Sequence, residues 1–167
     1  MPRFPPTMAP RHFLKTDPQR TLTVMREWST DENEHVRRLA SEGCRPRLPW
    51  SFQFRDAVAD PSLTMPILEA LRADPSLYVR KSVANHLNDI SKDHPHWLVD
   101  KLSSWPRGNA HTEWIIGQAL RTLVKRGHTG ALALVGVTGE ARARVETFSV
   151  APTSLVLGNR VSISAAI

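Results

Sequence analysis

The sequence is poor in the features on which several classes of protein depend. Its 167 residues include one cysteine, Cys44, so no disulfide can form within the chain, and this is typical of a reducing compartment. No apolar run approaches the roughly 18 residues that a membrane-spanning helix needs. Prolines interrupt the N-terminal segment, which lacks the apolar core of a secretory signal. We therefore expect a cytoplasmic protein with no membrane partner.

The chain also has few acidic residues relative to basic ones. Lys and Arg number 22 against 16 Asp and Glu, which gives a formal net charge of +6. An excess of positive charge suits a polyanionic partner, and nucleic acid fits better than a membrane. A basic, hydrated surface with no such partner explains the charge equally well. Charge alone leaves both interpretations open.

Helical periodicity dominates the first four fifths of the chain. Asp-Pro-Ser and similar starts, followed by apolar residues at helical spacing, mark the beginnings of helices, and Gly43 and Gly127 are placed as C-terminal caps. Residues 1–17 are rich in proline, and we expect them to be disordered. The pattern predicts helices over residues 18–28, 32–43, 51–58, 63–72, 76–91, 95–104 and 111–126, with a further helical turn over 128–135.

Two of these helices share a motif. Asp31 followed by Val36-Arg37-Arg38 recurs roughly 40 residues later as Asp74 followed by Val79-Arg80-Lys81. Paired helices with that period are typical of HEAT-type solenoids, whose repeats stack side by side. A chance match within an ordinary helical bundle is the alternative. We predict a mainly α fold, with a HEAT-like helical-repeat solenoid over residues 18–136.

After Gly136 the pattern changes to alternating, β-branched segments. Residues 144–150, 154–157 and 160–164 read as strands, and Gly158-Asn159 forms a turn between the last two. Two or three strands do not make a stable sheet alone. We therefore expect residues 143–167 to be an incomplete all-β segment.

The repeat register gathers polar side chains on one face. On a helical wheel, equivalent rows of the matched helices fall on one concave strip, formed by Arg38, Glu42, Lys81, Asn85, Asp89, Gln118 and Arg126. Basic groups there can bind phosphates. Glu42 and Asp89 would repel DNA unless they have a chemical role. A carboxylate near a sugar can stabilise an oxocarbenium-like centre and position a water.

Aromatic residues and simple ion pairs offer competing interpretations of this strip. Trp50 and Trp114 could stack on a cationic base, or both could belong to the core. Asp89 could simply form an ion pair with Lys92 or Lys81, and Glu42 could form one with Arg38 or Arg45, without a chemical role. Cys44 has no evident histidine partner for a nucleophilic role. The histidines His86, His94 and His96 lack metal-ligand spacing, so we expect no metal site.

Two stretches together, residues 34–50 and 79–92, resemble the bacterial DNA alkylation repair family. These are HEAT-like-repeat 3-methyladenine DNA glycosylases of the AlkC and AlkD type. The AlkC branch is more similar, because some of its members carry an immunoglobulin-like domain after the helices. The resemblance implies that residues 143–167 are an incomplete immunoglobulin-like segment. It also implies hydrolysis of the N-glycosidic bond of cationic N-alkylated purines, chiefly 3-methyladenine, without metal or cofactor.

The resemblance assigns roles to particular residues. Asp89 stands where the family carries its catalytic aspartate, and Glu42 and Trp50 stand where the AlkC branch carries lesion-site residues. Trp114 is a second candidate for contact with the base. Basic residues would hold the DNA backbone: Arg38, Arg45, Arg47, Arg80, Lys81, Lys92, Arg121, Lys125 and Arg126. The implied partner is double-stranded DNA containing alkylated bases, bound by a monomer associated with the nucleoid.

The sequence departs from the family at its N-terminus. Family members have further helices before the position of residue 20, including one lesion-contacting carboxylate, whereas here that region is proline-rich. We therefore expect a truncated member. The alternatives are an inactive fragment of the glycosylase, or a helical-repeat scaffold that binds nucleic acid or protein without chemistry.

Overall fold

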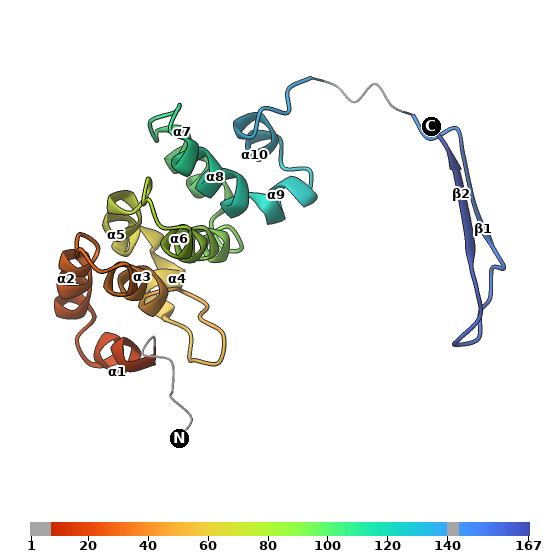
Figure 1. The fold of residues 1–167 in the computed structure, drawn as a ribbon. Coiled ribbons are helices and arrows are strands. Elements are labelled where there is room, and N and C mark those ends of the chain that lie inside the picture. Colours follow the sequence, from red (N-terminus) through yellow and green to blue (C-terminus); the bar gives the residue numbers. More distant parts are fainter. Residues whose placement is uncertain (1–7, 140–143) are drawn as a thin grey trace. The chain divides into compact units, whose positions relative to one another are not determined.

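The computed structural model describes residues 8–139 and 144–167 (Figure 1). They fall into two units, a helical unit that ends at Val137 and a β unit that begins at Thr138. No helix among the described residues is long and apolar enough to cross a membrane. The helical unit contains α1 (Ala9–Thr16), α2 (Pro18–Trp28), α3 (Glu34–Gly43), α4 (Arg55–Ala59), the 3-10 helix η2 (Pro61–Leu63), α5 (Met65–Ala70), α6 (Leu77–Ile90), α7 (Pro95–Ser103), α8 (Ala110–Ala119), α9 (Arg121–Lys125) and α10 (Thr129–Leu134).

The first helix corrects the expectation of a disordered N-terminal segment. Residues 1–7 lie outside the described residues, but from Ala9 to Thr16 the chain is helical, so the prediction is wrong there. Pro10 stands in the first turn, where a helix needs no backbone N–H, and it therefore favours this start. Arg11 and Leu14 are buried. Packing thus fixes a segment whose composition alone suggested disorder.

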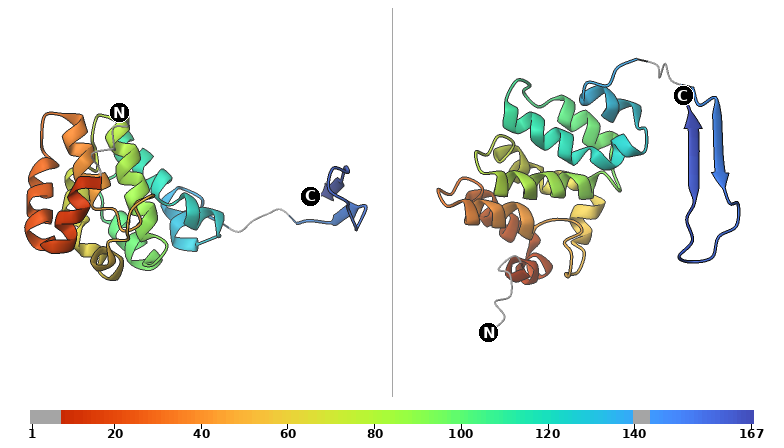
Figure 2. Two further views of the ribbon diagram at one scale, coloured as in Figure 1. Left: turned by 90° about the horizontal axis from the view of Figure 1, so that it is seen from below. Right: turned by 45° about the vertical axis from the view of Figure 1, so that its right-hand side comes forward.

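The helices α3, α6 and α8 lie side by side, with α6 packed between the other two (Figure 1 and Figure 2). The predicted apolar stripe of α6 is fully buried at Val79, Val83 and Leu87, and it belongs to one continuous core with Ala40 and Ile116. Stacking of successive helices over a shared core is the arrangement of a helical-repeat fold. The prediction of a mainly helical, repeat-based fold is therefore confirmed.

The shared motif has a structural purpose at the junction of the first two repeats. Arg37 Nε and NH2 donate to the two carboxylate oxygens of Asp74, at 2.7 and 3.2 Å. Arg37 NH1 also donates to the carbonyls of Asp31 and Glu32. The arginine of the first copy therefore binds the acid that opens the second copy. Bidentate pairing of this kind fixes orientation as well as distance.

Two local expectations are wrong for identifiable reasons. The predicted helix over 111–126 is interrupted at Leu120, where the Asn88 side-chain amide donates to the Ala119 carbonyl at 2.9 Å. A side chain inserted into the backbone ladder is a common cause of such a break.

Gly43, which was expected to be a C-terminal cap, is the last residue of α3 and does not adopt a positive φ. A Cβ there would lie 2.8 Å from Met25 Cε and 3.2 Å from Pro10 Cγ, so a larger residue would require these side chains to shift.

His86 is a polar group in the middle of the core. Its ring is fully buried, with Nδ1 3.0 Å from the Ser41 carbonyl and Nε2 3.1 Å from Thr64 Oγ1. The carbonyl can only accept, so Nδ1 donates to Ser41 and Nε2 accepts from Thr64. Burial lowers the pKa of His86 to about 3. The imidazole is therefore neutral and joins α3, α6 and the turn before α5.

The β unit is a two-stranded antiparallel hairpin of β1 (Thr147–Ala151) and β2 (Ser162–Ala166). Phe148 pairs with Ala165 and Val150 with Ile163, so one face is apolar and the other carries serine, threonine and alanine. The expected strands at 144–150 and 160–164 overlap β1 and β2. The expected strand at 154–157 is wrong, because it lies in the connection between them. Ala143 lies outside the described residues, and an immunoglobulin-like fold remains a prediction.

The buried neutral His86 predicts a specific acid sensitivity. The unfolded chain binds a proton at His86 near its ordinary pKa of 6.5, whereas the folded chain does so only near about 3. Stability should therefore fall as the pH drops from about 6.5 towards about 3, with this group contributing about 1.4 kcal/mol per pH unit. His86→Gln can keep both hydrogen bonds but cannot titrate. Urea unfolding across this range should give a shallower pH slope for the variant, and equal slopes would contradict the assignment.

Candidate functional site

The two carboxylates singled out in the sequence are joined by one arginine. Arg45 NH1 lies 2.8 Å from Glu42 Oε1, while Arg45 Nε and NH2 lie 2.9 and 2.8 Å from Asp89 Oδ2. Glu42 is at the end of α3, Asp89 is at the end of α6, and Arg45 begins the loop after α3. Glu42 is 7% exposed, Asp89 is 3% exposed and Arg45 is 8% exposed. We call them the Glu42–Arg45–Asp89 unit.

The remaining carboxylate oxygens also have partners. Ser82 Oγ donates to Glu42 Oε2 at 2.7 Å, and Arg38 NH2 lies 3.8 Å from the same oxygen. Lys92 Nζ lies 3.0 Å from Asp89 Oδ1. The simple ion pairs considered from the sequence, Asp89 with Lys92 and Glu42 with Arg45, are therefore present. The link from Arg45 to Asp89 of the next repeat was not anticipated.

Electrostatics keep Arg45 charged in this buried position. Burial by itself would lower the pKa of Arg45, but Asp89 and Glu42 together outweigh it and raise the pKa. A buried charge is tolerated when it is paired and its donors are used. Because one guanidinium serves two carboxylates, Lys92 and Arg38 supply the further positive charge at the rim of the unit.

The loop that follows α3 presents a tryptophan to solvent. Trp50 is 95% exposed and adopts a left-handed backbone with φ of 64°, which is uncommon for a bulky residue. Pro46 and Pro49 restrict the backbone before it, and Phe54 N–H closes the loop by donating to the Pro46 carbonyl at 3.0 Å. Trp50 is thus not a core residue. Its ring is free to contact a ligand.

Arg11 holds the base of this loop and was missed by the sequence reasoning. It is 1% exposed, and its guanidinium donates to the carbonyls of Gly43, at 3.3 Å, Arg45, at 2.7 Å, and Phe52. Burial lowers the pKa of Arg11. A cation fixed on three backbone carbonyls positions both ends of the loop that carries Arg45 and Trp50. Nothing in the proline-rich sequence around Arg11 signals this role.

Arg47 fastens the same loop to the turn after α6. Its Nε and NH2 lie 3.0 and 2.8 Å from the two oxygens of Asp93. Both side chains are partly exposed, at 30% and 27%. In this structure Arg47 is therefore engaged with a carboxylate, although it was expected to bind a DNA phosphate.

A second group of the expected residues lines a neighbouring groove. Its cavity of about 250 Å³ is lined by Lys81, Ala84, Asn85, Trp114, Gln118 and Arg121. Arg121 NH2 donates to Asn85 Oδ1 at 3.0 Å. Trp114 is half-buried against the core, and the Arg80 guanidinium lies 5.8 Å from its ring centre. Part of the predicted concave strip thus shares one hollow.

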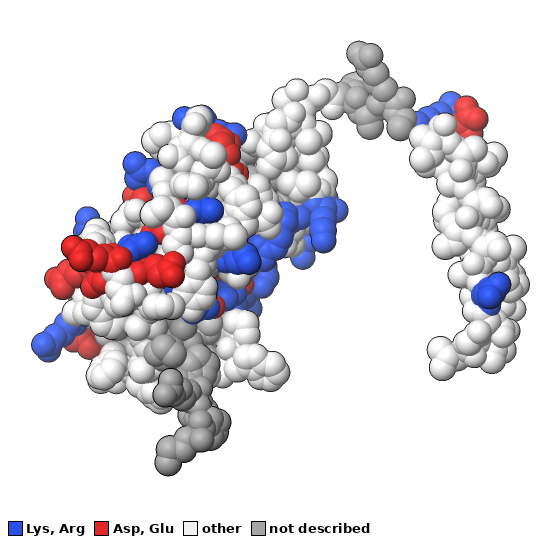
Figure 3. Space-filling model, in the orientation of Figure 1, with Lys and Arg blue, Asp and Glu red and all other residues white. Residues whose placement is uncertain are grey.

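Basic side chains gather at the α9 side of the helical unit, whereas acidic ones gather at the α2 side (Figure 3). Lys125 and Arg126 are exposed at the end of α9. Arg38 lies with its guanidinium 4.5 Å from the Tyr78 ring centre. The asymmetry of charge gives the helical unit one face suited to a polyanion.

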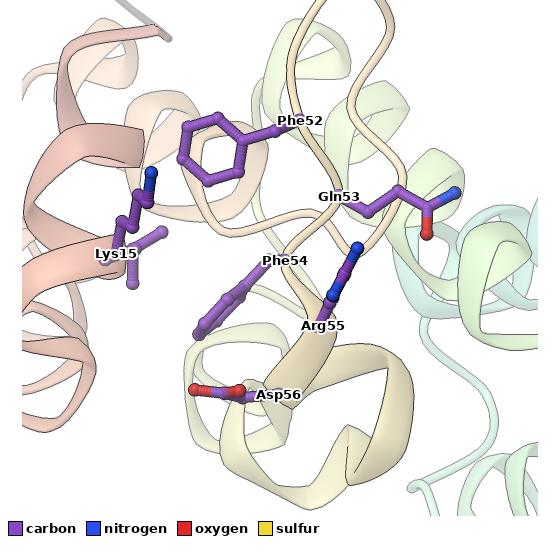
Figure 4. A pocket seen from close by; sticks show the side chains of 7 residues that line it. Lys15, Phe52, Gln53, Phe54, Arg55 and Asp56 are labelled. Atoms are coloured by element: carbon purple, nitrogen blue, oxygen red, sulfur yellow. The ribbon is translucent and has the colours of Figure 1, made fainter.

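A further cavity, possible metal ligands and Cys44 were also considered as sites, and none of them includes the Glu42–Arg45–Asp89 unit. A cavity of about 550 Å³ between α1 and the segment after Trp50 is lined by Leu14, Lys15, Phe52, Gln53, Phe54, Arg55 and Asp56 (Figure 4). Within residues 8–139 and 144–167, no three His, Cys, Asp or Glu side chains cluster as metal ligands would. Cys44 is fully buried, and burial raises the pKa of its thiol to about 12, which makes it a poor nucleophile.

Comparison of the chain with known proteins finds relatives among DNA repair proteins. The model of a family described as DNA alkylation repair enzyme matches residues 6–123. The chain is similar to the alkylpurine DNA glycosylase AlkC of Pseudomonas fluorescens, solved bound to DNA containing an abasic site analog. The identity is 55%, the TM-score is 0.88, and the match covers 95% of this chain and 44% of that chain.

Two further relatives extend the comparison. The uncharacterized protein YhaZ of Bacillus subtilis (strain 168) is 47% identical over 156 residues, which is 93% of this chain and 44% of YhaZ. AlkD2 from Streptococcus mutans is 30% identical with a TM-score of 0.54, and the match covers 64% of this chain and 50% of that one. The chain thus spans less than half the length of AlkC and YhaZ.

The Glu42–Arg45–Asp89 unit predicts a large cost of removing its cation. Arg45→Met should destabilise the protein by about 3 kcal/mol near neutral pH, because two buried carboxylates lose their shared partner. Urea unfolding of the variant and the wild type checks this. A loss below about 1 kcal/mol, which is typical of an exposed ion pair, would contradict it.

Proposed function

Because the chain belongs to the DNA alkylation repair enzyme family, we propose that its helical unit is a DNA glycosylase module. It excises cationic N-alkylated purines, such as 3-methyladenine, from double-stranded DNA by hydrolysis of the N-glycosidic bond. The observation that carries the proposal is the buried Glu42–Arg45–Asp89 unit, in a helical unit that also has an exposed tryptophan on the loop of Arg45 and a basic groove. The 55% identity to an alkylpurine DNA glycosylase supports it.

In this reaction the positive charge moves from the base to the sugar. The bond between C1′ and the purine nitrogen breaks, its electron pair neutralises the cationic base, and the sugar becomes an oxocarbenium-like cation. Water adds to C1′ and loses a proton, which leaves a neutral free base and an abasic site. Asp89 is the group that stabilises the sugar cation and positions the water, and Glu42 keeps Arg45 in place beside it.

Trp50 provides the contact with the damaged base. An aromatic face attracts a cation, and this attraction is stronger than for a neutral purine. The left-handed backbone of Trp50 and its nearly complete exposure support a role in binding, because strain of this kind persists where surrounding structure imposes it. Trp114 is half-buried in the neighbouring groove and serves there as a second contact.

The DNA backbone is held by the basic residues of the groove and of α9. Lys81 and Arg121 line the groove, and Lys125 and Arg126 are exposed beside it. Arg38 and Lys92 reach the rim of the carboxylate unit. Arg45 already donates to two carboxylates, so its role is to position Asp89. It does not make the contact with the DNA backbone that was first expected of it.

A non-catalytic helical scaffold is the second candidate, because both carboxylates are paired in ion pairs. Such a scaffold would bind DNA through the same basic surface and would tolerate loss of Asp89. The two functions therefore differ in one respect, which is whether base release depends on Asp89.

Asp89→Asn should lower release of 3-methyladenine from methylated DNA by about a hundredfold or more, because it removes the charge that stabilises the sugar cation. Binding to DNA with an abasic site analogue should survive. Release is measured by chromatography of the free base under single-turnover conditions. Asp100→Asn on the exposed side of α7 is the matched control and should release base normally. Equal release by Asp89→Asn and the wild type would leave only the scaffold.

The backbone contacts predict a salt effect. Lys125→Met should weaken binding of damaged and undamaged DNA by the same factor, because a phosphate contact carries no sequence or lesion information. The slope of log affinity against log salt should fall in magnitude by about 0.9. Fluorescence anisotropy over a salt series measures both. Lys101→Met on α7 is the control, and a slope that changes equally in both variants would remove Lys125 from the interface.

A further inference from the structure

We propose that Lys92 is a displaceable counter-ion of Asp89, and that it makes the site selective for positive charge. In the free protein the Lys92 ammonium occupies Asp89 Oδ1. A cationic sugar or base replaces it there, whereas a neutral nucleotide leaves it in place. The inference rests on the proposed function, and it adds a specificity-determining residue to it.

The two cations on Asp89 are held very differently. Arg45 places Nε and NH2 on Oδ2, is 9% exposed in its side chain, and is bound at its other end to Glu42. Its backbone carbonyl is in turn held by Arg11. Lys92 makes one contact, from Nζ to Oδ1 at 3.0 Å, and its side chain is 44% exposed. Of the two, Lys92 is therefore the one that can leave.

The chemistry of the exchange favours a cationic ligand. A partly exposed lysine–carboxylate pair separated by three residues contributes little stability, since water and side-chain entropy compete with it. Its loss is cheap when another positive charge takes the place of the ammonium. A neutral group would instead leave Oδ1 of a carboxylate with a 4% exposed side chain short of a counter-charge. The cost of displacing Lys92 is thus recovered only by a cation.

The position of Lys92 also suits what it does after displacement. It stands just beyond the end of α6, and its four-carbon stem is flexible. A released ammonium can therefore move into solvent, where its departure from Asp89 costs little.

The experiment compares two DNA duplexes that differ in one charge. One contains a pyrrolidine abasic analogue, whose ring nitrogen is protonated, and the other contains a neutral tetrahydrofuran analogue. Affinities are measured by fluorescence anisotropy at one fixed salt concentration, because salt changes both. The readout is the ratio of the neutral to the cationic dissociation constant. It does not require catalytic turnover.

The expected ratios separate Lys92 from an ordinary phosphate contact. Lys92→Met should raise the ratio about two- to fivefold, because the cation no longer displaces an ion pair of this kind. Lys92→Arg should lower it, since a guanidinium holds a carboxylate more firmly. Asp89→Asn should bring the ratio close to one. Lys81→Met, on α6, is the matched control, and it should weaken both duplexes equally and leave the ratio unchanged.

The other outcomes overturn either the inference alone or the proposed function with it. If the wild type binds both duplexes but Lys92→Met and Lys92→Arg leave the ratio at its wild-type value, Lys92 is only a phosphate contact and the inference is wrong. If the wild type binds both duplexes equally, Asp89 is not a cation site and the inference is also wrong. If the wild type, folded by circular dichroism, binds neither duplex, the proposed function fails and the inference fails with it.

Discussion

The site depends on one constraint, which is the charge of Arg45 held between carboxylates of two successive repeats. Glu42 ends α3 and Asp89 ends α6, so Arg45 ties the two helices together at their C-terminal ends. At their N-terminal ends the Arg37–Asp74 pair does the same. Two helices fixed at both ends cannot slide or rotate past one another without breaking buried, charge-assisted hydrogen bonds. The relative placement of Glu42 and Asp89 is therefore a property of the repeat stacking itself.

The loop after α3 is built to serve that constraint. Arg11 donates to backbone carbonyls of the loop, and Arg47 attaches the loop to Asp93 beyond the end of α6. The loop is thus anchored on three elements while its tip, Trp50, stays exposed. A rigid base and a free aromatic ring are what a contact with a ligand needs, because little conformational entropy is then lost on binding. The same anchoring leaves Lys92 as the least constrained charge around Asp89.

Much of the helical unit could be predicted from sequence because apolar periodicity and capping residues are local signals. The helix Pro18–Trp28 matched the expected span, and the repeated Asp…Val-Arg motif correctly indicated stacked repeats. Other features had no local signal. The helix α1 forms because Pro10 is accepted in its first turn and because Arg11 and Leu14 are buried, and the break at Leu120 depends on Asn88 of another repeat. Grouping Glu42 with Asp89 followed from the helical register, but their link through Arg45 required the loop conformation, which no periodicity determines.

A crystal structure of the chain bound to duplex DNA with the protonated pyrrolidine analogue would show directly whether Asp89 binds a cationic sugar. We predict that the ring nitrogen lies within about 3 Å of Asp89 Oδ1, that Lys92 has left that oxygen, and that Arg45 still bridges Glu42 and Asp89. A complex in which the Lys92–Asp89 pair is intact and the cationic ring is bound elsewhere would rule this role of Asp89 out.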